Sequence, residues 1–214
     1  MQSIGHITLN ISLLIYLIYF IPQIIHNHRQ NTTADISLAT HSLMVASNMM
    51  DLIYGFGFSL EWQYRLVTTL TLSFLMIQQF QILKARYDLT LKVHTLIICI
   101  ITAAIILLIY GNIIPRSLLI TAGIISSIIY CGYWIPQIIL NFKLKKADGF
   151  SIIYLRLVFI ACMCDLTSAL SLGWPYPSVV TPIIIMSMIL IIFYQRRKYK
   201  KIQDHLVHTE LVYS

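Results

Sequence analysis

The sequence predicts an all-α membrane protein with seven transmembrane helices. Of the 214 residues, 58% are hydrophobic and only 11% are charged, whereas a soluble domain usually carries about 25% charged residues. The mean hydropathy is +0.78, and the apolar residues gather in seven runs long enough to cross a bilayer as helices. A chain with so little polar surface cannot cover a water-soluble globule, so we expect one multi-pass membrane domain.

The seven runs follow one another along the whole chain. Membrane-spanning strands would alternate polar and apolar residues over about ten positions, and these runs do not. Helices satisfy every backbone group internally, as lipid requires. The first run has no basic segment before it and is long enough to span, so we expect it not to be a cleaved signal peptide. The expected spans are Ile4–Ile25, Ser37–Phe58, Leu66–Leu83, Val93–Tyr110, Ser117–Leu140, Ser151–Leu172 and Ser178–Tyr194.

Basic residues lie mostly on one side of these spans. Twelve of the 15 Lys and Arg lie in the first, third and fifth loops and the tail, whereas Arg65 and Arg116 lie on the other side and Arg156 lies near the start of the sixth span. The positive-inside rule then predicts a cytoplasmic C-terminus and an N-terminus that is outside or luminal. This topology explains the net charge of +7, so we expect contact with the lipid bilayer and no nucleic-acid partner.

The chain matches itself when it is shifted by 114 residues. The stretch "IPQII" occurs at residues 21–25 and again at 135–139. Matched Pro, Asn, Tyr and Asp are not expected by chance between two Ile-rich helices, so we infer a duplication. The other matched pairs include Tyr16/Tyr130, Tyr19/Tyr133, Asn27/Asn141, Ser37/Ser151, Met49/Met163 and Asp51/Asp165.

The duplication predicts two parallel three-helix repeats joined by a linker helix, a 3+1+3 arrangement. The expected units are residues 1–87, the linker helix 88–114, residues 115–196 and a basic cytoplasmic tail, 197–214. Parallel repeats related by an axis along the membrane normal are typical of transporters, whose substrate site lies between the repeats near the midplane.

Paired Pro-Gln motifs in the first and fifth of seven helices resemble the PQ-loop family. That family includes lysosomal exporters of cystine and of cationic amino acids, and it is related to the SWEET sugar facilitators. The stretches "ISLATHSLMVASNMMDLIYGF" and "GFSIIYLRLVFIACMCD" are most similar to the cationic amino acid branch. The resemblance implies a vacuolar or lysosome-like membrane, although the high Ile content and compact loops also suit a bacterial membrane.

The two prolines are expected to act as hinges. A proline inside a helix removes one backbone hydrogen bond and clashes with the preceding turn, and bending near the cytoplasmic end would open or close the inner mouth. A static kink is the alternative. The glutamines are expected to bond the freed carbonyls or to face the pathway, with a tyrosine one turn earlier on the same face. The predicted hinge and gate residues are Pro22, Gln23, Tyr19, Pro136, Gln137 and Tyr133.

Asp51 and Asp165 are the candidate substrate ligands. An aspartate at a helix centre costs about 2.5–3.5 kcal/mol on insertion scales, and such residues mark substrate or ion pathways. No lysine lies within a span to pair with them, and Arg156 lies on the opposite helix face from Asp165. We therefore expect a cationic substrate or a proton to supply the positive charge; a purely structural pairing is the alternative. Asn48, Tyr54, Tyr16, Tyr130 and Ser168 complete the predicted binding set.

The function that these features favour is transport of cationic amino acids by alternating access. Lysine and arginine are the expected substrates, with histidine as a further candidate, and no cofactor is expected, while proton coupling and the oligomeric state stay open. The alternatives are a SWEET-like sugar facilitator and a nutrient-sensing membrane scaffold. We expect no enzyme, because the spans hold no HExxH motif and no Ser/His/Asp set. A retinal protein would need a lysine in the last span, which has none.

A few other residues are expected to have local roles. The aromatic residues Trp62, Tyr64, Trp174 and Tyr176 are expected to form an interfacial belt. His41, near the start of the second span, is a candidate to reach the pathway. The four cysteines all fall in apolar segments and are expected to be small buried hydrophobes and not metal ligands.

Overall fold

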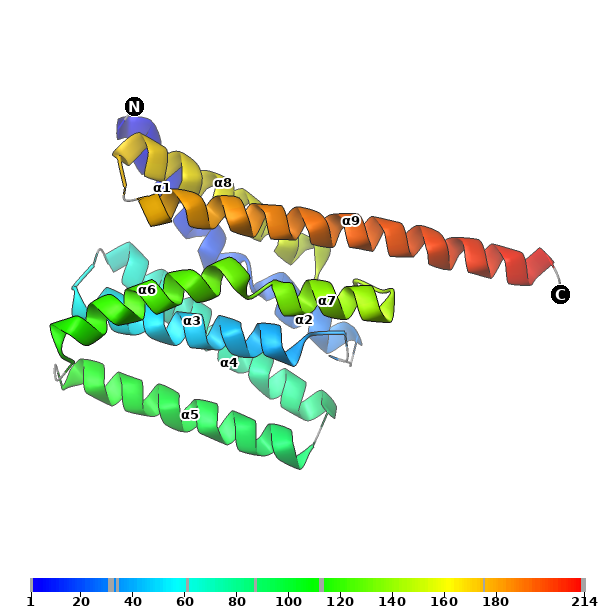
Figure 1. Cartoon of the computed structure of the whole chain (residues 1–214), viewed down its shortest axis with the longest axis horizontal. Helices are drawn as coiled ribbons and strands as arrows, with labels where there is room; N and C mark the ends of the chain where they lie inside the picture. Colours follow the sequence, from blue (N-terminus) through cyan, green and yellow to red (C-terminus); the bar gives the residue numbers. More distant parts are fainter. Residues whose placement is uncertain are drawn as a thin grey trace.

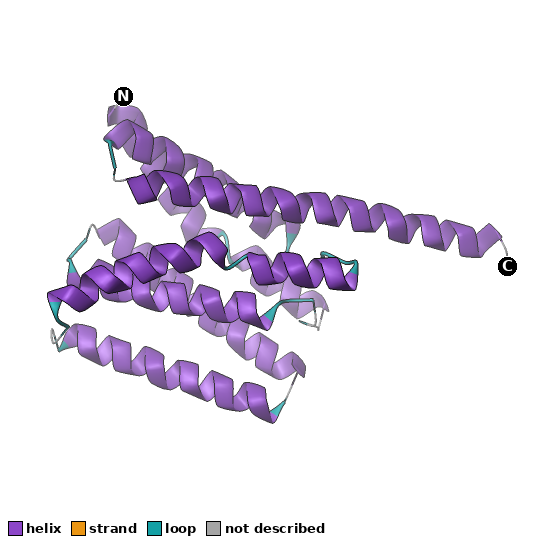
Figure 2. Ribbon diagram, in the orientation of Figure 1, coloured by secondary structure: helices purple, strands orange, loops and turns teal. Residues whose placement is uncertain are grey.

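Every regular element in the described part of the chain is a helix (Figure 2), which confirms the all-α prediction there. The structure is a computed structural model that describes residues 2–30, 33, 35–60, 62–86, 88–111, 114–174 and 176–212. The helices are α1 (Gln2–Ile18), α2 (Ile21–Gln30), α3 (Leu38–Gly57), α4 (Trp62–Arg86), α5 (Leu89–Tyr110), α6 (Arg116–Gly132), α7 (Ile135–Leu144), α8 (Ile152–Leu172) and α9 (Tyr176–Val212).

The first and fifth expected helices are each broken in two. Residues 19–20 separate α1 from α2, and residues 133–134 separate α6 from α7. Pro22 and Pro136 are therefore the second residues of new helices, where the missing N–H removes no intrahelical bond. Each of these expected spans is therefore one helical segment, Gln2–Arg29 or Arg116–Leu144, that is interrupted just before its proline.

Six helical segments in the described part of the chain are long and apolar enough to cross a membrane, so the chain is a multi-pass membrane protein. α3, which fills the second expected span, is not among them, because its middle carries polar residues such as Ser47 and Asn48. Both of these side chains are buried, so they face the protein interior and not lipid. The count of seven spans stays a prediction. The six segments are Gln2–Arg29, Trp62–Arg86, Leu89–Tyr110, Arg116–Leu144, Ile152–Leu172 and Ser178–Ile202.

The first helix of each repeat packs along the second helix of the other repeat. α1 lies along α8, and α3 lies along α6. Small residues allow the close approach: a Cβ added to Gly5 of α1 would meet Leu172 of α8 at 2.7 Å, and one added to Gly123 of α6 would meet Tyr54 of α3 at 2.7 Å. The two repeats are therefore interleaved and do not form separate bodies.

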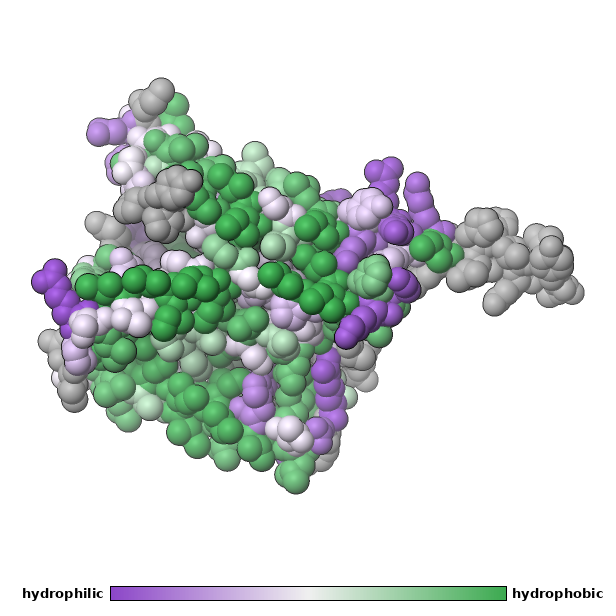
Figure 3. Space-filling model, in the orientation of Figure 1, coloured by the Kyte–Doolittle hydropathy of each residue, from purple (hydrophilic) through white to green (hydrophobic). Residues whose placement is uncertain are grey.

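The linker helix and the last helix lie outside this interleaved centre. α5 packs on α3 and α4 at one edge (Figure 1). α9 continues as one helix to Val212 and projects beyond the other helices, although the seventh span was expected to end at Tyr194. Hydrophilic residues gather where α9 leaves the bundle, while apolar residues cover most of the remaining visible face (Figure 3).

Candidate functional site

Asp165 of α8 is bound by two hydroxyl groups of α1. Tyr16 donates its hydroxyl to Oδ2 of Asp165 at 2.5 Å, and Ser12 donates to Oδ1. Ser12 is buried, and it lies one helical turn before Tyr16, so both donors share a face of α1. Hydroxyl donors stabilise a carboxylate in its charged form, and they fix Asp165 in the interface between α1 and α8.

Asp51 of α3 has the symmetry-related partners in α6. Ser126, the counterpart of Ser12, donates to Oδ1 of Asp51 at 3.3 Å. Tyr130, the counterpart of Tyr16, lies within electrostatic reach of this carboxylate. The same Ser and Tyr positions of the repeat therefore serve the aspartate of the other repeat in both halves.

A tyrosine of α4 gives Asp51 a further partner that has no counterpart at Asp165 among the described side chains. Tyr64 donates to Oδ1 of Asp51, and Thr68 donates to Oδ2 at 3.5 Å. The prediction that Tyr64 belongs to an interfacial belt was therefore wrong. Trp62 and Trp174 are 58% and 38% exposed, and the side chain of Tyr176 lies outside the described residues.

The described partners of both aspartates are hydroxyl groups and include no Lys or Arg. Both aspartates are half-buried. No described hydrogen bond joins the two carboxylates, and each has its own set of donors in its own helix interface. The structure thus places Asp51 and Asp165 at counterpart positions without bringing them into direct contact.

Aromatic rings fill the space next to the two helix breaks. Tyr16 meets Tyr19 edge-on with ring centroids 5.2 Å apart, and Tyr130 meets Tyr133 edge-on at 5.8 Å. Tyr19 is buried, stacks on Tyr154 at 5.6 Å, and its hydroxyl lies 3.1 Å from that of Thr71. Tyr16 and Tyr130 are therefore each in contact with the expected gate tyrosine of their own repeat.

The other three predicted binding residues differ in how they are held. Asn48 donates Nδ2 to the carbonyl of Met44 at 3.1 Å, whereas its Oδ1 is buried without a hydrogen-bond partner. Ser168 donates to the carbonyl of Cys164 and lies 2.7 Å from the hydroxyl of Thr8. Asn48 therefore has a free acceptor, while Ser168 lies in the α1–α8 interface.

Tyr54 packs between α3 and α6. Its ring lies against Gly123 and meets Phe58 edge-on. A cavity of about 340 Å³ lies nearby, where α3 and α5 end and α6 begins, and its lining includes Phe56, Leu108 and Arg116. None of the predicted binding residues lines this cavity, so its position does not mark the site that the sequence predicts.

Gln23 binds the loop that precedes α8 in the other repeat. Its Nε2 donates to the carbonyl of Gly149 at 3.1 Å and to Oδ1 of Asn27 at 2.8 Å. Its Oε1 accepts from the backbone N–H of Ser151 at 2.7 Å. Gln23 is fully buried, so all of its polar atoms are satisfied inside the protein.

Gln137 repeats this arrangement in the opposite direction. Its Nε2 donates to the carbonyl of Asp35 and to Oδ1 of Asn141, both at 2.8 Å, and its Oε1 accepts from the N–H of Ser37 at 2.7 Å. The prediction that the glutamines bond the carbonyls freed by the prolines was therefore wrong, whereas the prediction that they face the pathway stays a prediction. We call the cross-repeat bonds of Gln23 and Gln137 the glutamine clasp.

Two further glutamines bind the asparagines that contact Gln23 and Gln137. Gln81 of α4 accepts from Nδ2 of Asn27 at 3.0 Å and donates to the carbonyl of Ile24 at 3.1 Å. Gln195 of α9 makes the corresponding bonds to Asn141 and Ile138, at 3.1 and 2.9 Å. The sequence reasoning missed both residues. Residues 81 and 195 are also 114 positions apart, so extending the repeat register past Asp51 would have found them.

The two clasped loops touch each other at the end of the molecule where most basic residues lie. A Cβ added to Gly149 would lie 2.2 Å from the carbonyl oxygen of Asp35, its counterpart in the other repeat. Lys146 pairs with Asp35 at 2.6 Å, and Arg196 pairs with Asp148 at 3.3 Å. Toward the opposite end the group α1, α8 and α9 diverges from the other helices (Figure 1), and the surface is hollowed there (Figure 3). The centre is therefore closed at the basic end.

Comparison with known proteins agrees with the repeat seen in the structure. The PQ loop repeat matches residues 4–64 and again residues 118–178, two segments with the same offset of 114 that together cover more than half of the chain. Over 81 residues the chain is 35% identical to the vacuolar histidine transporter YPQ3 of Saccharomyces cerevisiae. That match covers 37% of this chain and 27%, or about a quarter, of the yeast protein. The chain belongs to the PQ-loop repeat family.

Proposed function

We propose that this chain transports cationic amino acids, namely lysine, arginine and histidine, across a vacuolar or lysosome-like membrane by alternating access. The observation that carries the proposal is the pair Asp51 and Asp165, half-buried at counterpart positions with hydroxyl groups as their described partners. The printed name of the yeast relative, a vacuolar histidine transporter, supports the same substrate class and membrane.

A cationic substrate provides the charge that these carboxylates lack. Opposite charges about 4 Å apart gain roughly 4 kcal/mol at an effective dielectric of 20, which is comparable with the roughly 2.5–3.5 kcal/mol that an aspartate costs at a helix centre. The free Oδ1 of Asn48 can accept a hydrogen bond from a substrate N–H. The faces of Tyr16 and Tyr130 add cation–π attraction. A neutral sugar would offer the two carboxylates no charge, so a sugar facilitator is less well supported.

Alternating access requires the glutamine clasp to open. Four cross-repeat hydrogen bonds hold the clasp closed, and each contributes about 0.5–1.5 kcal/mol net. Opening therefore costs roughly 2–6 kcal/mol, the scale of an equilibrium between two populated conformations. The breaks at residues 19–20 and 133–134 lie between the clasp and the aspartates, so α2 and α7 can tilt while α1 and α6 stay packed. In this form the hinge hypothesis rests on the helix breaks together with the prolines.

Uptake into liposomes tests the proposal. The purified full chain is reconstituted, and uptake of labelled arginine, lysine and histidine is measured beside glucose. Asp51→Asn and Asp165→Asn each keep the size of the side chain but remove its charge, and each is expected to reduce cationic uptake at least about tenfold, which corresponds to about 1.4 kcal/mol.

Asp88→Asn is the matched control for these variants. Asp88 is exposed and its side chain makes no capping hydrogen bond at the start of α5, so this change is expected to leave uptake unaltered. Glucose uptake without cationic uptake, or full arginine uptake by both aspartate variants, would contradict the proposal.

A further inference from the structure

The first repeat contains a buried group of polar side chains whose hydrogen-bonding capacity is largely unused. His41 of α3 is 1% exposed and neither ring nitrogen has a hydrogen-bond partner. Gln78 of α4 is fully buried, and both polar atoms of its amide lack a partner. Oε1 of the neighbouring Gln79 is also buried without a partner. Buried polar groups are normally hydrogen-bonded, so these side chains have the capacity to bind a small polar ligand.

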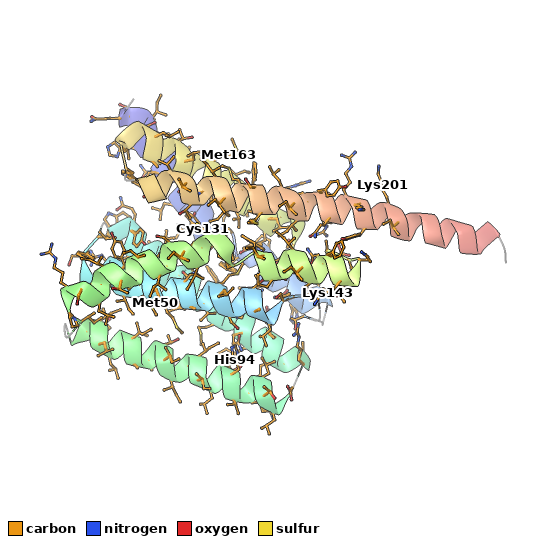
Figure 4. All side chains as sticks on the ribbon, in the orientation of Figure 1. Met50, His94, Cys131, Lys143, Met163 and Lys201 are labelled. Carbon is orange, nitrogen blue, oxygen red and sulfur yellow. The ribbon has the colours of Figure 1, made fainter. Side chains whose placement is uncertain are left out.

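These side chains face one another between three helices. Gln78 and Gln79 lie beside the His41 ring, and His94 of α5 lies within electrostatic reach of it. Nε2 of His94 is 3.1 Å from the hydroxyl of Ser42, and Nδ1 is 3.4 Å from Nε2 of Gln79. Figure 4 shows His94 on the side of α5 that faces α3 and α4. The group therefore connects the first repeat with the linker helix.

The second repeat has no such group at the same positions. The counterparts of His41 and Gln78 are Leu155 and Ile192, which are 0% and 1% exposed and belong to the hydrophobic core. The 114-residue register holds for α4 and α9, because Gln81 of α4 and Gln195 of α9 make equivalent bonds. The polar group is therefore particular to the first repeat, which is also the repeat that packs on the linker helix α5.

We propose that His41 is a proton-binding site whose occupancy controls transport. A neutral imidazole has one N–H and one free lone pair, so it takes up one proton from water and becomes an imidazolium with two N–H donors. The unpartnered Oε1 atoms of Gln78 and Gln79 are two acceptors for those donors. The described residues include no cluster of three His, Cys, Asp or Glu suited to a metal ion, so the ligand class is a proton accompanied by water.

The charged and titratable groups near the His41 ring leave Oε1 of Gln78 and Gln79 as the acceptors for the imidazolium N–H groups. α5 presents His94 to the His41 ring, whereas Tyr130 of α6 packs on Tyr133 and lies near Asp51. Lys143 at the end of α7 is exposed, and Asp51 lies ten residues further along α3, bound to Tyr64. Because Gln79 also contacts the linker helix, its turning toward a protonated His41 would alter the contact between α4 and α5. The consequence for transport rests on the proposed function, whereas protonation of His41 does not.

The first test measures protonation directly. The full chain is labelled with 15N-histidine, placed in lipid nanodiscs and followed by NMR from about pH 2.5 to 8. His41→Gln is expected to remove one titrating ring, and Gln78→Leu is expected to lower the midpoint of that ring by about one pH unit, because it removes an acceptor for the charged form. His6→Gln changes an exposed ring on α1 and is the control. A His41 ring that does not titrate in this range would overturn the proposal whatever the transport result.

The second test copies the second repeat into the first. The double variant His41→Leu/Gln78→Ile carries the side chains that pack well at the counterpart positions, so it is expected to fold. Arginine uptake by the wild type is expected to differ several-fold between about pH 4 and pH 7, and the double variant is expected to lose this difference. An unchanged pH profile in the double variant would refute the control of transport by His41. Absence of cationic uptake by the wild type would refute the proposed function instead, and the NMR titration would still decide the protonation.

Discussion

Replacing Gln23 with Leu should open the basic end of the molecule. Leu is close to Gln in size but has no polar atoms, so the variant loses the bonds to the carbonyl of Gly149 and the N–H of Ser151 and the bond to Asn27 within α2. The two cross-repeat bonds exist only in the closed state, and each contributes about 0.5–1.5 kcal/mol. The closed state should therefore lose roughly 1–3 kcal/mol relative to the open state. Since 1.4 kcal/mol is a factor of ten, the ratio of closed to open molecules should fall about 5- to 150-fold.

Distances between spin labels at positions 29 and 143 report this change. Arg29 and Lys143 are exposed counterparts just beyond the clasp in α2 and α7, and the four native cysteines, which are free thiols, would first be replaced. The unmodified clasp should give mainly a short distance, and Gln23→Leu should add or enlarge a longer one. Gln137→Leu should have the same effect because its bonds are the mirror arrangement.

Two comparisons separate opening of the clasp from general loss of stability. Gln2→Leu removes an exposed glutamine at the start of α1 and should leave the distance unchanged. Gln23→Glu keeps an acceptor for the N–H of Ser151 but removes the donor to Gly149, so its effect should lie between wild type and Gln23→Leu. A lower melting temperature with an unchanged distance distribution in both Leu variants would show that the glutamines hold the fold and not a gate.

Three further predictions follow from the same contacts. Gly149→Ala should favour the open state by about 1–3 kcal/mol, because its Cβ would lie 2.2 Å from the backbone of Asp35; an unchanged label distance at positions 29 and 143 would contradict this. The hydrogen bond and charge of Asp35 raise the pKa of Lys146 above its usual 10.5, so the ammonium group keeps its charge at neutral pH and loses it as the pH rises through the raised pKa. Lys146→Gln should therefore destabilise the closed state by at most about 1 kcal/mol at neutral pH, because the pair is partly exposed, and the label distances should change only slightly. Tyr64→Phe should lower the thermal midpoint by several degrees, since a hydrogen bond to a charged group contributes about 1.5–3 kcal/mol, and a variant as stable as the wild type would show that Asp51 does not depend on Tyr64.

The residue pairs of the clasp could be predicted from the sequence, but their bonding could not. The 114-residue register pairs Gln23 with Gln137 and Ser37 with Ser151, and the structure uses all four residues in equivalent roles. The register shows which residues occupy equivalent positions in the two repeats, but it does not show which residues lie close together. It therefore cannot tell whether Gln23 binds the loop of its own repeat or that of the other repeat. The answer depends on how the repeats interleave, which is a property of helix packing in three dimensions.

The breaks before the two prolines were missed for a similar reason. A proline signals the end of one helix or the start of the next with almost the same local pattern, because the residue before a proline disfavours the helical region and the first helical turn tolerates the missing N–H. The long apolar run favoured one continuous helix across residues 19–20. Gln23 is buried with all of its polar atoms hydrogen-bonded. Two of these bonds go to a loop more than 120 residues away, and a local sequence pattern cannot predict such a contact.

Some contacts occur in both repeats of the structure, and others occur in only one of them. The clasp, the glutamines behind it and the Ser–Tyr donors to each aspartate recur in both repeats, which is the expected result when a two-fold arrangement must open and close evenly. Tyr64 has Ser178 as its counterpart, and Asn48 has Cys162, so the surroundings of Asp51 and Asp165 differ within the same framework. An amino acid has different groups at its two ends, and a symmetric site could not distinguish them. The differences between the repeats are therefore where substrate orientation should be decided, and exchanging Asn48 and Cys162 should alter the choice between arginine, lysine and histidine while leaving the clasp closed.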